Sequence, residues 1–193
     1  MDLSDDYIID RLTKGDRKIF EYIYTRYVNS LYAYGKGFEL SDNELEDILH
    51  DLFLSFLATP GIFAGVKNVK SYLFASLKNR ILNILKTPRE YSDIHRYEHL
   101  FIAKVDLLDE MIDREEADRR KQQVQSLLKS LTSRQQEAIY LRYMQKLSYD
   151  EIAQILRLTS KGARKLVARG IEQMRGKITK EALGMWIGIA TIF

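Results

Sequence analysis

Four basic side chains recur at helical spacing near the C-terminal end of the chain. They are Lys161, Arg164, Lys165 and Arg169, which fall largely on one side of a helix. The small and apolar residues among them fall on the other side and would face a core: Ala163, Val167, Gly170 and Met174. Residues 157–180 hold eight Lys or Arg and one acidic residue. Such a helix suits the phosphates and base edges of a DNA major groove.

A shorter helix and a tight turn are predicted just before this basic helix. Ser148 and Glu151 stand three residues apart, which is typical of a capping box. The shorter helix would therefore begin at Leu147 or Ser148, and its apolar stripe comprises Ile152, Ala153 and Leu156. Residues 157–159 form the turn, and the basic helix runs from about residue 160 to residue 175. This order predicts a helix-turn-helix whose second helix reads DNA.

Cations, rings and amides are mixed in a second segment, residues 67–86. Its members are Lys67, Lys70, Tyr72, Phe74, Lys78, Asn79, Arg80, Asn83 and Lys86. Single-stranded DNA needs this mixture, because cations neutralise the backbone, a ring stacks on a base and amides bond to base edges. The aromatic rings could instead be buried in the protein core. We expect burial for Phe74, which shares an apolar stripe with Leu77, Ile81 and Leu85. Tyr72 fits both burial and stacking on a base.

Asp47 and Asp51 lie one helical turn apart and share a face, opposite a buried face of Leu49, Leu52, Phe53 and Phe56. Paired carboxylates occur in acid/base catalysis and in metal sites, but no histidine–carboxylate cluster surrounds this pair, so a plain surface pair is the alternative. His95 and His99 are spaced like two ligands, yet three histidines and no cysteine are too few for the usual zinc site. We expect no metal.

Motifs of enzymes are missing from the sequence, which contains no Walker loop, nucleophile elbow or dinucleotide fingerprint. We therefore expect no enzyme activity, no cofactor and no small-molecule substrate. The chain has no cysteine and no secretory signal at its start, which fits a cytoplasmic protein.

Charge alternates in blocks along the chain. Residues 1–66 carry six bases and twelve acids, and residues 67–88 carry five bases and no acid. Residues 89–118 carry four bases and ten acids, and residues 119–193 carry fifteen bases and five acids. Because binding to phosphates needs clustered Lys and Arg, the two positive blocks predict two contacts with DNA.

Apolar residues recur at helical spacing throughout, and no useful stretch alternates like a strand. We expect a short helix through Leu12, a long one from about residue 19 to residue 35, one from a capping box at Ser41 to about residue 58, and one over residues 69–86. The prediction is an all-α chain of two small helical domains joined by a linker. The predicted parts are residues 1–88, an acidic linker at 89–118 that forms a solvated tether, residues 119–178, and an apolar tail at 179–193.

The end of the tail, residues 182–193, carries no charged side chain. Twelve residues fall short of the roughly 20 that span a bilayer as a helix, so we expect no membrane span. Large apolar side chains left in water would promote aggregation. We expect the tail to be buried, either as a strap on the C-terminal domain or as a wedge between the two domains.

Several segments also resemble a known family. Residues 131–137 and 147–153 (LTSRQQE and LSYDEIA) resemble the promoter-reading C-terminal domain of bacterial RNA polymerase sigma factors of the extracytoplasmic-function (ECF) group. Residues 46–57 resemble that family's core-polymerase-binding helix, and residues 69–83 resemble its promoter-melting helix. The resemblance covers residues from about 3 to 178. The chain departs from the pattern at Tyr72, where Trp is common, at Arg157, where a turn Gly is common, and at Gly162.

The resemblance implies a sigma factor, with core RNA polymerase and promoter DNA as partners and an anti-sigma factor as a further partner. It implies that Ser160, Lys161, Arg164, Lys165 and Arg169 contact the −35 element. It implies −10 contacts from Lys67, Lys70, Ser71, Tyr72, Lys78, Asn79 and Asn83, with residues 59–68 as a specificity loop. Core polymerase would bind Glu44, Asp47, His50 and Asp51, and the acidic linker would thread into the polymerase near the RNA exit route.

Two other classes of protein compete with this interpretation. The first is a stand-alone helix-turn-helix regulator with an unrelated N-terminal domain, which the two N-terminal motifs disfavour. A regulator would also bind its DNA site unaided, whereas a sigma factor gains specificity with the core enzyme. The second is an enzyme that acts on nucleic acids, for which the sequence lacks a catalytic cluster.

Overall fold

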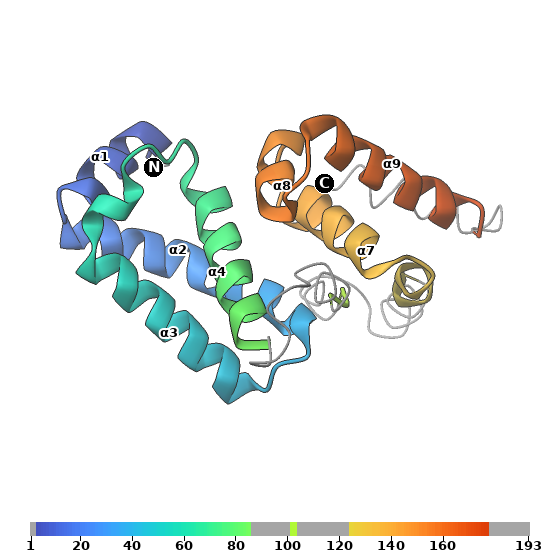
Figure 1. Cartoon of the computed structure of the whole chain (residues 1–193), viewed down its shortest axis with the longest axis horizontal. Helices are drawn as coiled ribbons and strands as arrows, with labels where there is room; N and C mark the ends of the chain where they lie inside the picture. The colour runs from blue at the N-terminus through green and yellow to red at the C-terminus, as the bar shows by residue number, and fades with distance from the viewer. Residues whose placement is uncertain (1–2, 86–100, 104–123, 178–193) are drawn as a thin grey trace, which may run out of the picture. The chain divides into compact units, whose positions relative to one another are not determined.

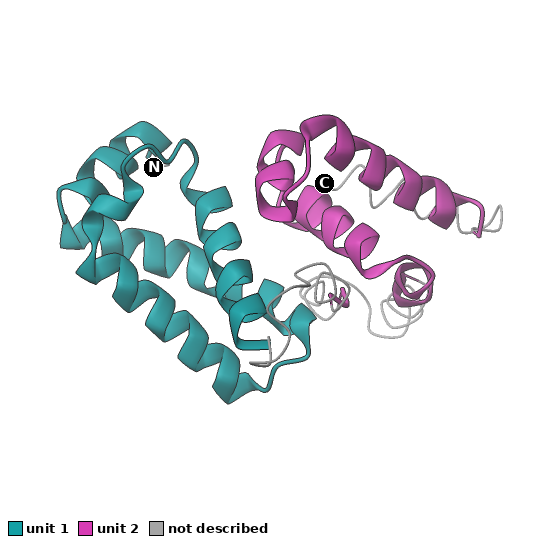
Figure 2. Ribbon diagram, in the orientation of Figure 1, with its two compact units in different colours: residues 1–97 teal, residues 98–193 magenta. Residues whose placement is uncertain are grey.

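The computed structural model describes residues 3–85, 101–103 and 124–177, and within these ranges it contains helices and no strand. The chain divides into two compact units, residues 1–97 and 98–193 (Figure 2). The predicted all-α class, with two helical domains and a linker, is confirmed. Of the helices in the described ranges, none combines the length and apolar character needed to cross a membrane.

Several predictions concern residues outside the described ranges. They are most of the linker, the tail from residue 179 onward, the pair His95 and His99, and the domain boundaries at residues 88 and 118. Three linker residues, 101–103, are described as part of unit 2, and Phe101 and Ala103 are only 1% and 4% exposed. The prediction of a solvated tether is therefore wrong for Phe101 and Ala103, because other residues of unit 2 cover them, whereas Ile102 is half-buried.

Unit 1 contains the four helices that the apolar spacing predicts (Figure 1). They are α1 (Asp5–Thr13), α2 (Arg17–Gly35), α3 (Asp42–Ala58) and α4 (Val69–Leu85), with short 3-10 helices η1 (Lys36–Phe38) and η2 (Pro60–Phe63). The predicted capping box at the start of α3 is present: the Ser41 hydroxyl accepts from the Glu44 N–H at 3.3 Å, and the Ser41 N–H donates to the Glu44 carboxylate at 2.9 Å.

The start of α4 is capped partly by α1. The side-chain carbonyl oxygen of Asn68 accepts a hydrogen bond from the Ser71 N–H at 2.7 Å. Asp5 of α1 accepts from the Asn68 amide at 2.8 Å and from the Val69 N–H at 3.3 Å. Because the first N–H groups of a helix have no partner within the helix, these bonds satisfy the end of α4 and tie it to the first helix.

Aromatic rings fill the core of unit 1. Tyr34, Phe63 and Phe74 are fully buried, and the Tyr34 ring lies 5.1 Å from the Phe74 ring, centroid to centroid. The predicted burial of Phe74 is thus confirmed. α2 and α3 also approach closely, since a Cβ atom at Gly35 would lie 2.3 Å from a methyl carbon of Leu45. The tight core fixes how α3 and α4 present their outer faces.

Unit 2 contains α7 (Ser133–Ile139), the π-helix η4 (Tyr140–Met144), α8 (Tyr149–Leu156) and α9 (Ser160–Arg175), and residues 124–129 are also helical. The residues predicted to face inward from α8 and α9 are all buried. The predicted capping box is formed, because Ser148 accepts from the Glu151 N–H and donates its own N–H to Glu151. The predicted helix-turn-helix is therefore confirmed as a fold.

The turn between α8 and α9 takes a left-handed backbone at Arg157, with φ of 52°. This conformation costs a non-glycine residue about 1–2 kcal/mol. α7 and α9 pack closely behind it, because a Cβ atom at Gly170 would lie only 2.7 Å from Cδ1 of Ile139. The close contact holds α9 on α7 and leaves the opposite side of α9 in solvent.

Candidate nucleic-acid interface

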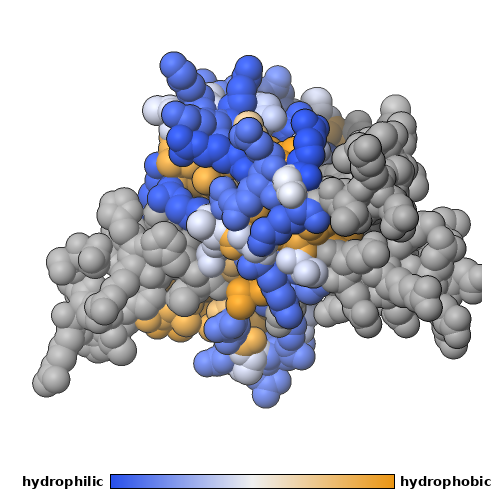
Figure 3. All heavy atoms as spheres, turned by 90° about the vertical axis from the view of Figure 1, so that its right-hand side faces the viewer, coloured by the Kyte–Doolittle hydropathy of each residue, from blue (hydrophilic) through white to orange (hydrophobic). Residues whose placement is uncertain are grey.

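The outer face of α9 carries the five residues predicted to contact the −35 element. Ser160, Lys161, Arg164, Lys165 and Arg169 are all exposed. Hydrophilic residues cover much of the upper part of the space-filling view, at the height where α8 and α9 run in Figure 1 (Figure 3). The first turn is capped by Thr159, whose hydroxyl accepts from the Gly162 N–H at 3.0 Å. α9 thus presents a basic face on a fixed support.

One tyrosine from α8 lies beside the basic face. The guanidinium of Arg164 lies 5.1 Å from the centroid of the Tyr149 ring, and the guanidinium of Arg142 lies 4.7 Å from the same centroid. Arg142 is itself held, because its Nη1 donates to the Leu147 carbonyl at 2.7 Å. The sequence predictions did not include Arg142 or Tyr149, which precede α9 by more than ten residues. The ring restricts where the Arg164 side chain points.

Ser160 is engaged with α8 as well, since its hydroxyl donates to the Asp150 carboxylate. This bond joins the first residue of α9 to the first turn of α8 and helps to set the angle between the two helices. The Ser160 hydroxyl therefore supports the helix-turn-helix in addition to lying on its exposed face.

The π-helix η4 forms the connection between α7 and α8. Gln145, at its end, donates from its amide to the Tyr140 hydroxyl at 3.1 Å, and both side chains are buried. Burial raises the pKa of Tyr140 to about 12, so the phenol is neutral at physiological pH. Lys146 follows with a left-handed backbone, φ 56°. Wide turns of this kind often occur at functional sites, and here the turn carries Arg142.

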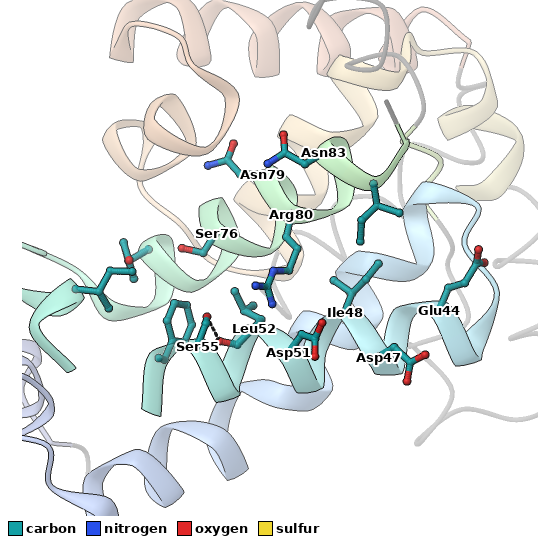
Figure 4. A pocket seen from close by; sticks show the side chains of 14 residues that line it. Glu44, Asp47, Ile48, Asp51, Leu52, Ser55, Ser76, Asn79, Arg80 and Asn83 are labelled. Carbon is teal, nitrogen blue, oxygen red and sulfur yellow. Dashed lines mark hydrogen bonds between the residues drawn. The ribbon is translucent and has the colours of Figure 1, made fainter. Parts of the chain in front are cut away.

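A groove of about 690 Å³ runs between α3 and α4 of unit 1 (Figure 4). The polar residues along it are Glu44, Asp47, Asp51 and Ser55 on α3 and Ser76, Asn79, Arg80 and Asn83 on α4, beside the Tyr72 hydroxyl. Its apolar lining includes Ile48, Leu52, Phe56, Ile62, Tyr72 and Ile84. Acidic side chains thus line the α3 wall, and amide and basic side chains line the α4 wall.

The groove gathers residues from two separate predictions. Three of the four predicted polymerase-binding residues line it, whereas His50 is exposed on α3 but does not. Tyr72, Asn79 and Asn83 of the predicted −10 contacts line it too. Lys67 is exposed outside the groove, and Lys70 is half-buried with its Nζ 6.0 Å from the centroid of the Phe74 ring.

Two of the predicted −10 contacts need correction. Ser71 and Lys78 are only 1% and 4% exposed. Ser71 lies three residues before Phe74, and Lys78 lies four residues after it, so both fall on the buried stripe of α4. In this conformation both side chains are shielded from solvent, so neither belongs to an exposed DNA-binding surface.

Tyr72 combines the two roles that the sequence left open. Its ring lies 5.8 Å from the Phe56 ring and 5.5 Å from the Phe63 ring, yet the residue is only partly buried and lines the groove. Burial raises the pKa of its hydroxyl, so the side chain stays neutral. Core rings therefore hold Tyr72 in place at the wall of the groove.

Arg80 is a groove residue that the predicted site omitted. Figure 4 shows its side chain extending from α4 toward α3, near Leu52 and Asp51. Its Nη1 is buried and has no hydrogen-bond partner among the described residues. A buried N–H without a partner costs about 1–3 kcal/mol, which a polar ligand in the groove would recover. The signal in the sequence was its place between Asn79 and Asn83.

Glu44 lines the groove and also forms the capping box of α3 with Ser41. Hydrogen bonds from the side chain and N–H of Ser41 lower the pKa of its carboxyl group. The carboxylate is therefore charged at neutral pH and adds to the acidic wall.

Comparisons with known proteins agree with this geometry. Residues 121–174, which include α7, α8 and nearly all of α9, match the family described as Sigma-70, region 4. The chain is also similar to the ECF RNA polymerase sigma-E factor of Haemophilus influenzae, with 24% identity over 185 residues that cover 91% of this chain and 96% of the relative. Sigma factors are not a class of enzymes. With a region 4 helix-turn-helix and a likeness to an ECF factor along most of its length, the chain is similar to the ECF sigma factors of RNA polymerase.

Proposed function

We propose that this sigma factor directs core RNA polymerase to promoters through two surfaces on different units. The basic face of α9 reads the −35 element, and the groove between α3 and α4 serves core polymerase and the −10 strand. The exposed basic face on the second helix of a region 4 helix-turn-helix is the observation that carries the proposal. The chain performs no catalytic step of its own and selects the site at which the polymerase acts.

The side chains of α9 divide the work of DNA binding. An arginine can pair with both acceptors of a guanine in the major groove, and Arg164 lies in the first turns of α9, which enter the groove in helix-turn-helix proteins. Lys161, Lys165 and Arg169 are exposed around it and suit phosphates on either side. Arg164 would thus supply selectivity, and its neighbours would supply salt-dependent affinity.

Tyr149 supports this assignment because it orients Arg164. Fixing a long side chain on binding costs about 0.5–1.5 kcal/mol, and a ring that holds the guanidinium beforehand reduces this cost. We expect Tyr149→Ala to lower −35-dependent transcription about two- to fivefold, as an exposed cation–π contact of about 0.5–1 kcal/mol implies. Tyr149→Phe keeps the ring and should behave like the wild type.

The measurement is run-off transcription from a promoter with an intact −35 element and from one in which it is scrambled. Thermal unfolding of both variants controls for damage to α8. A Tyr149→Ala protein that folds normally and uses the intact −35 element as well as the wild type would contradict the role of the ring.

The groove of unit 1 offers two walls of different chemistry. Exposed Asp47 and Asp51 on α3 suit a basic surface of core polymerase, and charge complementarity of this kind sets the association rate and the orientation of the partner. Asn79, Asn83 and Arg80 on α4 can donate hydrogen bonds to an unpaired base, and Tyr72 offers a ring for stacking worth about 1–3 kcal/mol. A polymerase-bound groove would thus hold a melted −10 base beside the enzyme.

The experiment that tests the proposal is reconstitution. Purified chain and core polymerase together should initiate transcription at a subset of genomic promoters, and neither should do so alone. The chain by itself should also bind duplex promoter DNA weakly. Strong, specific footprints from the chain alone, with no initiation after addition of core enzyme, would support a stand-alone regulator instead.

An anti-sigma factor stays a predicted partner. A protein that covered the acidic wall of the groove would compete with core polymerase for Asp47 and Asp51, and one that covered α9 would block the −35 contact. Co-purification of the chain from its natural host, with and without excess core polymerase, would identify such a competitor.

A further inference from the structure

The groove between α3 and α4 carries a charge that is unfavourable for nucleic acid. Its lining includes three carboxylates, those of Glu44, Asp47 and Asp51, and one guanidinium, that of Arg80 (Figure 4). Three negative charges against one positive charge leave a formal charge of −2. A strand of DNA brings a further negative charge with every phosphate, so the acidic wall repels such a strand.

The other cations of the 67–86 segment that the structure describes do not offset this charge within the groove. Lys67 is exposed outside the groove, and Lys78 is only 4% exposed. Lys70 is half-buried and does not line the groove either. Among the described residues, Arg80 is therefore the one cation in the lining. One cation beside three carboxylates is too few to neutralise the phosphates of a bound strand.

Arg80 is nevertheless placed to bind an acceptor that the described part of the chain does not supply. Its side chain extends from α4 toward α3, near Leu52 and Asp51 (Figure 4), and its Nη1 is buried without a hydrogen-bond partner among the described residues. Asn79 and Asn83 line the same wall, one helical turn apart. Because phosphate and base oxygens accept hydrogen bonds from guanidinium and amide groups, the α4 wall suits the strand that the α3 wall repels.

The two walls are close enough for the charge on one to act at the other. The helices α3 and α4 pack against each other, and the axes of packed helices lie about 8–10 Å apart. The Debye length at physiological salt is about 8 Å, so dissolved ions screen only part of the field across the groove. The repulsion therefore operates under physiological conditions and weakens as the salt concentration rises.

We propose that the acidic wall acts as an electrostatic gate, which keeps single-stranded DNA out of the groove until core polymerase binds α3. The inference rests on the proposed function, in which Asp47 and Asp51 contact a basic surface of the polymerase. That contact neutralises both carboxylates, and the strand then meets Arg80 without the opposing charge. The same groove is thus a site for the melted strand in the complex and a closed site in the free chain.

A fluorophore inside the groove tests the gate, because it does not report DNA bound to the basic face of α9. The chain contains no cysteine, so Ile84→Cys, at an exposed position of the groove lining, accepts a single environment-sensitive label. The same label at Thr25→Cys, exposed on α2 outside the groove, is the control position. Each labelled full-length chain is titrated with a pool of short single-stranded DNA of random sequence.

Asp47→Asn combined with Asp51→Asn is expected to lower the Kd reported by the groove label about two- to thirtyfold. Each partly screened charge contributes about 1.4- to fivefold. Asp6→Asn with Glu21→Gln changes the net charge equally at exposed positions of α1 and α2, and it should leave this Kd near the wild-type value. Equal effects of the two double variants, or an equal response at the control label, would overturn the gate.

Core polymerase should have the same effect as the two asparagines. After subtraction of the signal from the polymerase alone, its addition to the chain with native carboxylates should also lower the Kd at the groove label. Arg80→Met, added to the Asp47→Asn and Asp51→Asn chain, removes the donor and should abolish the gain. If Arg80→Met instead weakened binding of core polymerase and left the strand response unchanged, Arg80 would belong to the protein interface and the gate would be wrong.

Run-off transcription with core polymerase separates failure of the gate from failure of the proposed function. If the wild-type chain initiates transcription but the asparagine variant gains no affinity for the strand, the gate alone is overturned. If the wild-type chain never initiates transcription with core polymerase, the proposed function is overturned.

Discussion

Asp47→Lys combined with Asp51→Lys is expected to raise the Kd for core RNA polymerase by a factor that corresponds to about 2–5 kcal/mol. Both carboxylates are exposed on the α3 wall of the groove, one helical turn apart. Reversing them replaces two attractive charges with two repulsive ones against a basic partner. The Kd is measured by fluorescence anisotropy of labelled full-length chain titrated with core enzyme, and transcription should fall with it.

A matched control separates this effect from a general change of net charge. Asp6→Lys with Glu21→Lys makes the same change at exposed positions of α1 and α2 that do not line the groove, and it should leave the Kd near the wild-type value. Binding of both proteins to a −35 duplex should also be unaffected or slightly increased. If the two double variants lost affinity for the polymerase equally, the groove would not be the docking surface.

Arg164→Ala, and separately Lys165→Ala, should weaken promoter use that depends on the −35 element. The expected loss is about 1–3 kcal/mol where the side chain contacts a base edge. Arg164→Ala should also relax the preference at one position of the element, whereas loss of a phosphate contact at Lys165 should weaken all sequences alike and reduce the salt dependence. Competition transcription over a library of −35 sequences, at two salt concentrations, distinguishes these outcomes.

Lys129→Ala serves as the control for these variants, because Lys129 is exposed in unit 2 but lies outside α9. It removes the same charge and should have little effect on the choice of −35 sequence. The affinity for core polymerase should also be unchanged in all three proteins. A core-binding defect shared by Arg164→Ala and the Asp47/Asp51 variant would contradict the division of labour between the two units.

Local sequence signals predicted most of the helical framework. The Ser41–Glu44 and Ser148–Glu151 pairs each mark a helix start within one residue, because a capping box depends on a hydroxyl and a carboxylate at fixed spacing. Arg157 occupies the turn between α8 and α9 as predicted. The inward side of α9 also followed from spacing alone, since an amphipathic helix on the surface shows its buried stripe directly.

Features that depend on contacts between residues far apart in the sequence could not be predicted from local patterns. Lys78 was placed at the DNA because of its charge, although its spacing from Phe74 and Ile81 put it on the buried stripe. The hydrogen bond from the Ala103 N–H to Gln136 could not be anticipated, because the two residues lie more than thirty positions apart. The π-helix over Tyr140–Met144, with its hydrogen bond between Gln145 and Tyr140, was likewise not predicted from the local spacing of residues. Contacts at such separations are properties of the folded unit.

The cap that Asp5 provides for α4 also bears on how unit 1 is assembled after synthesis. Asp5 is synthesised before its partner Asn68, which follows 63 positions later. Contacts of such high sequence separation raise the contact order of a domain and slow its folding, because a long loop must close before the contact is made. We therefore expect the cap of α4 to form only after both ends of unit 1 have been synthesised, so that this helix start is completed late in folding.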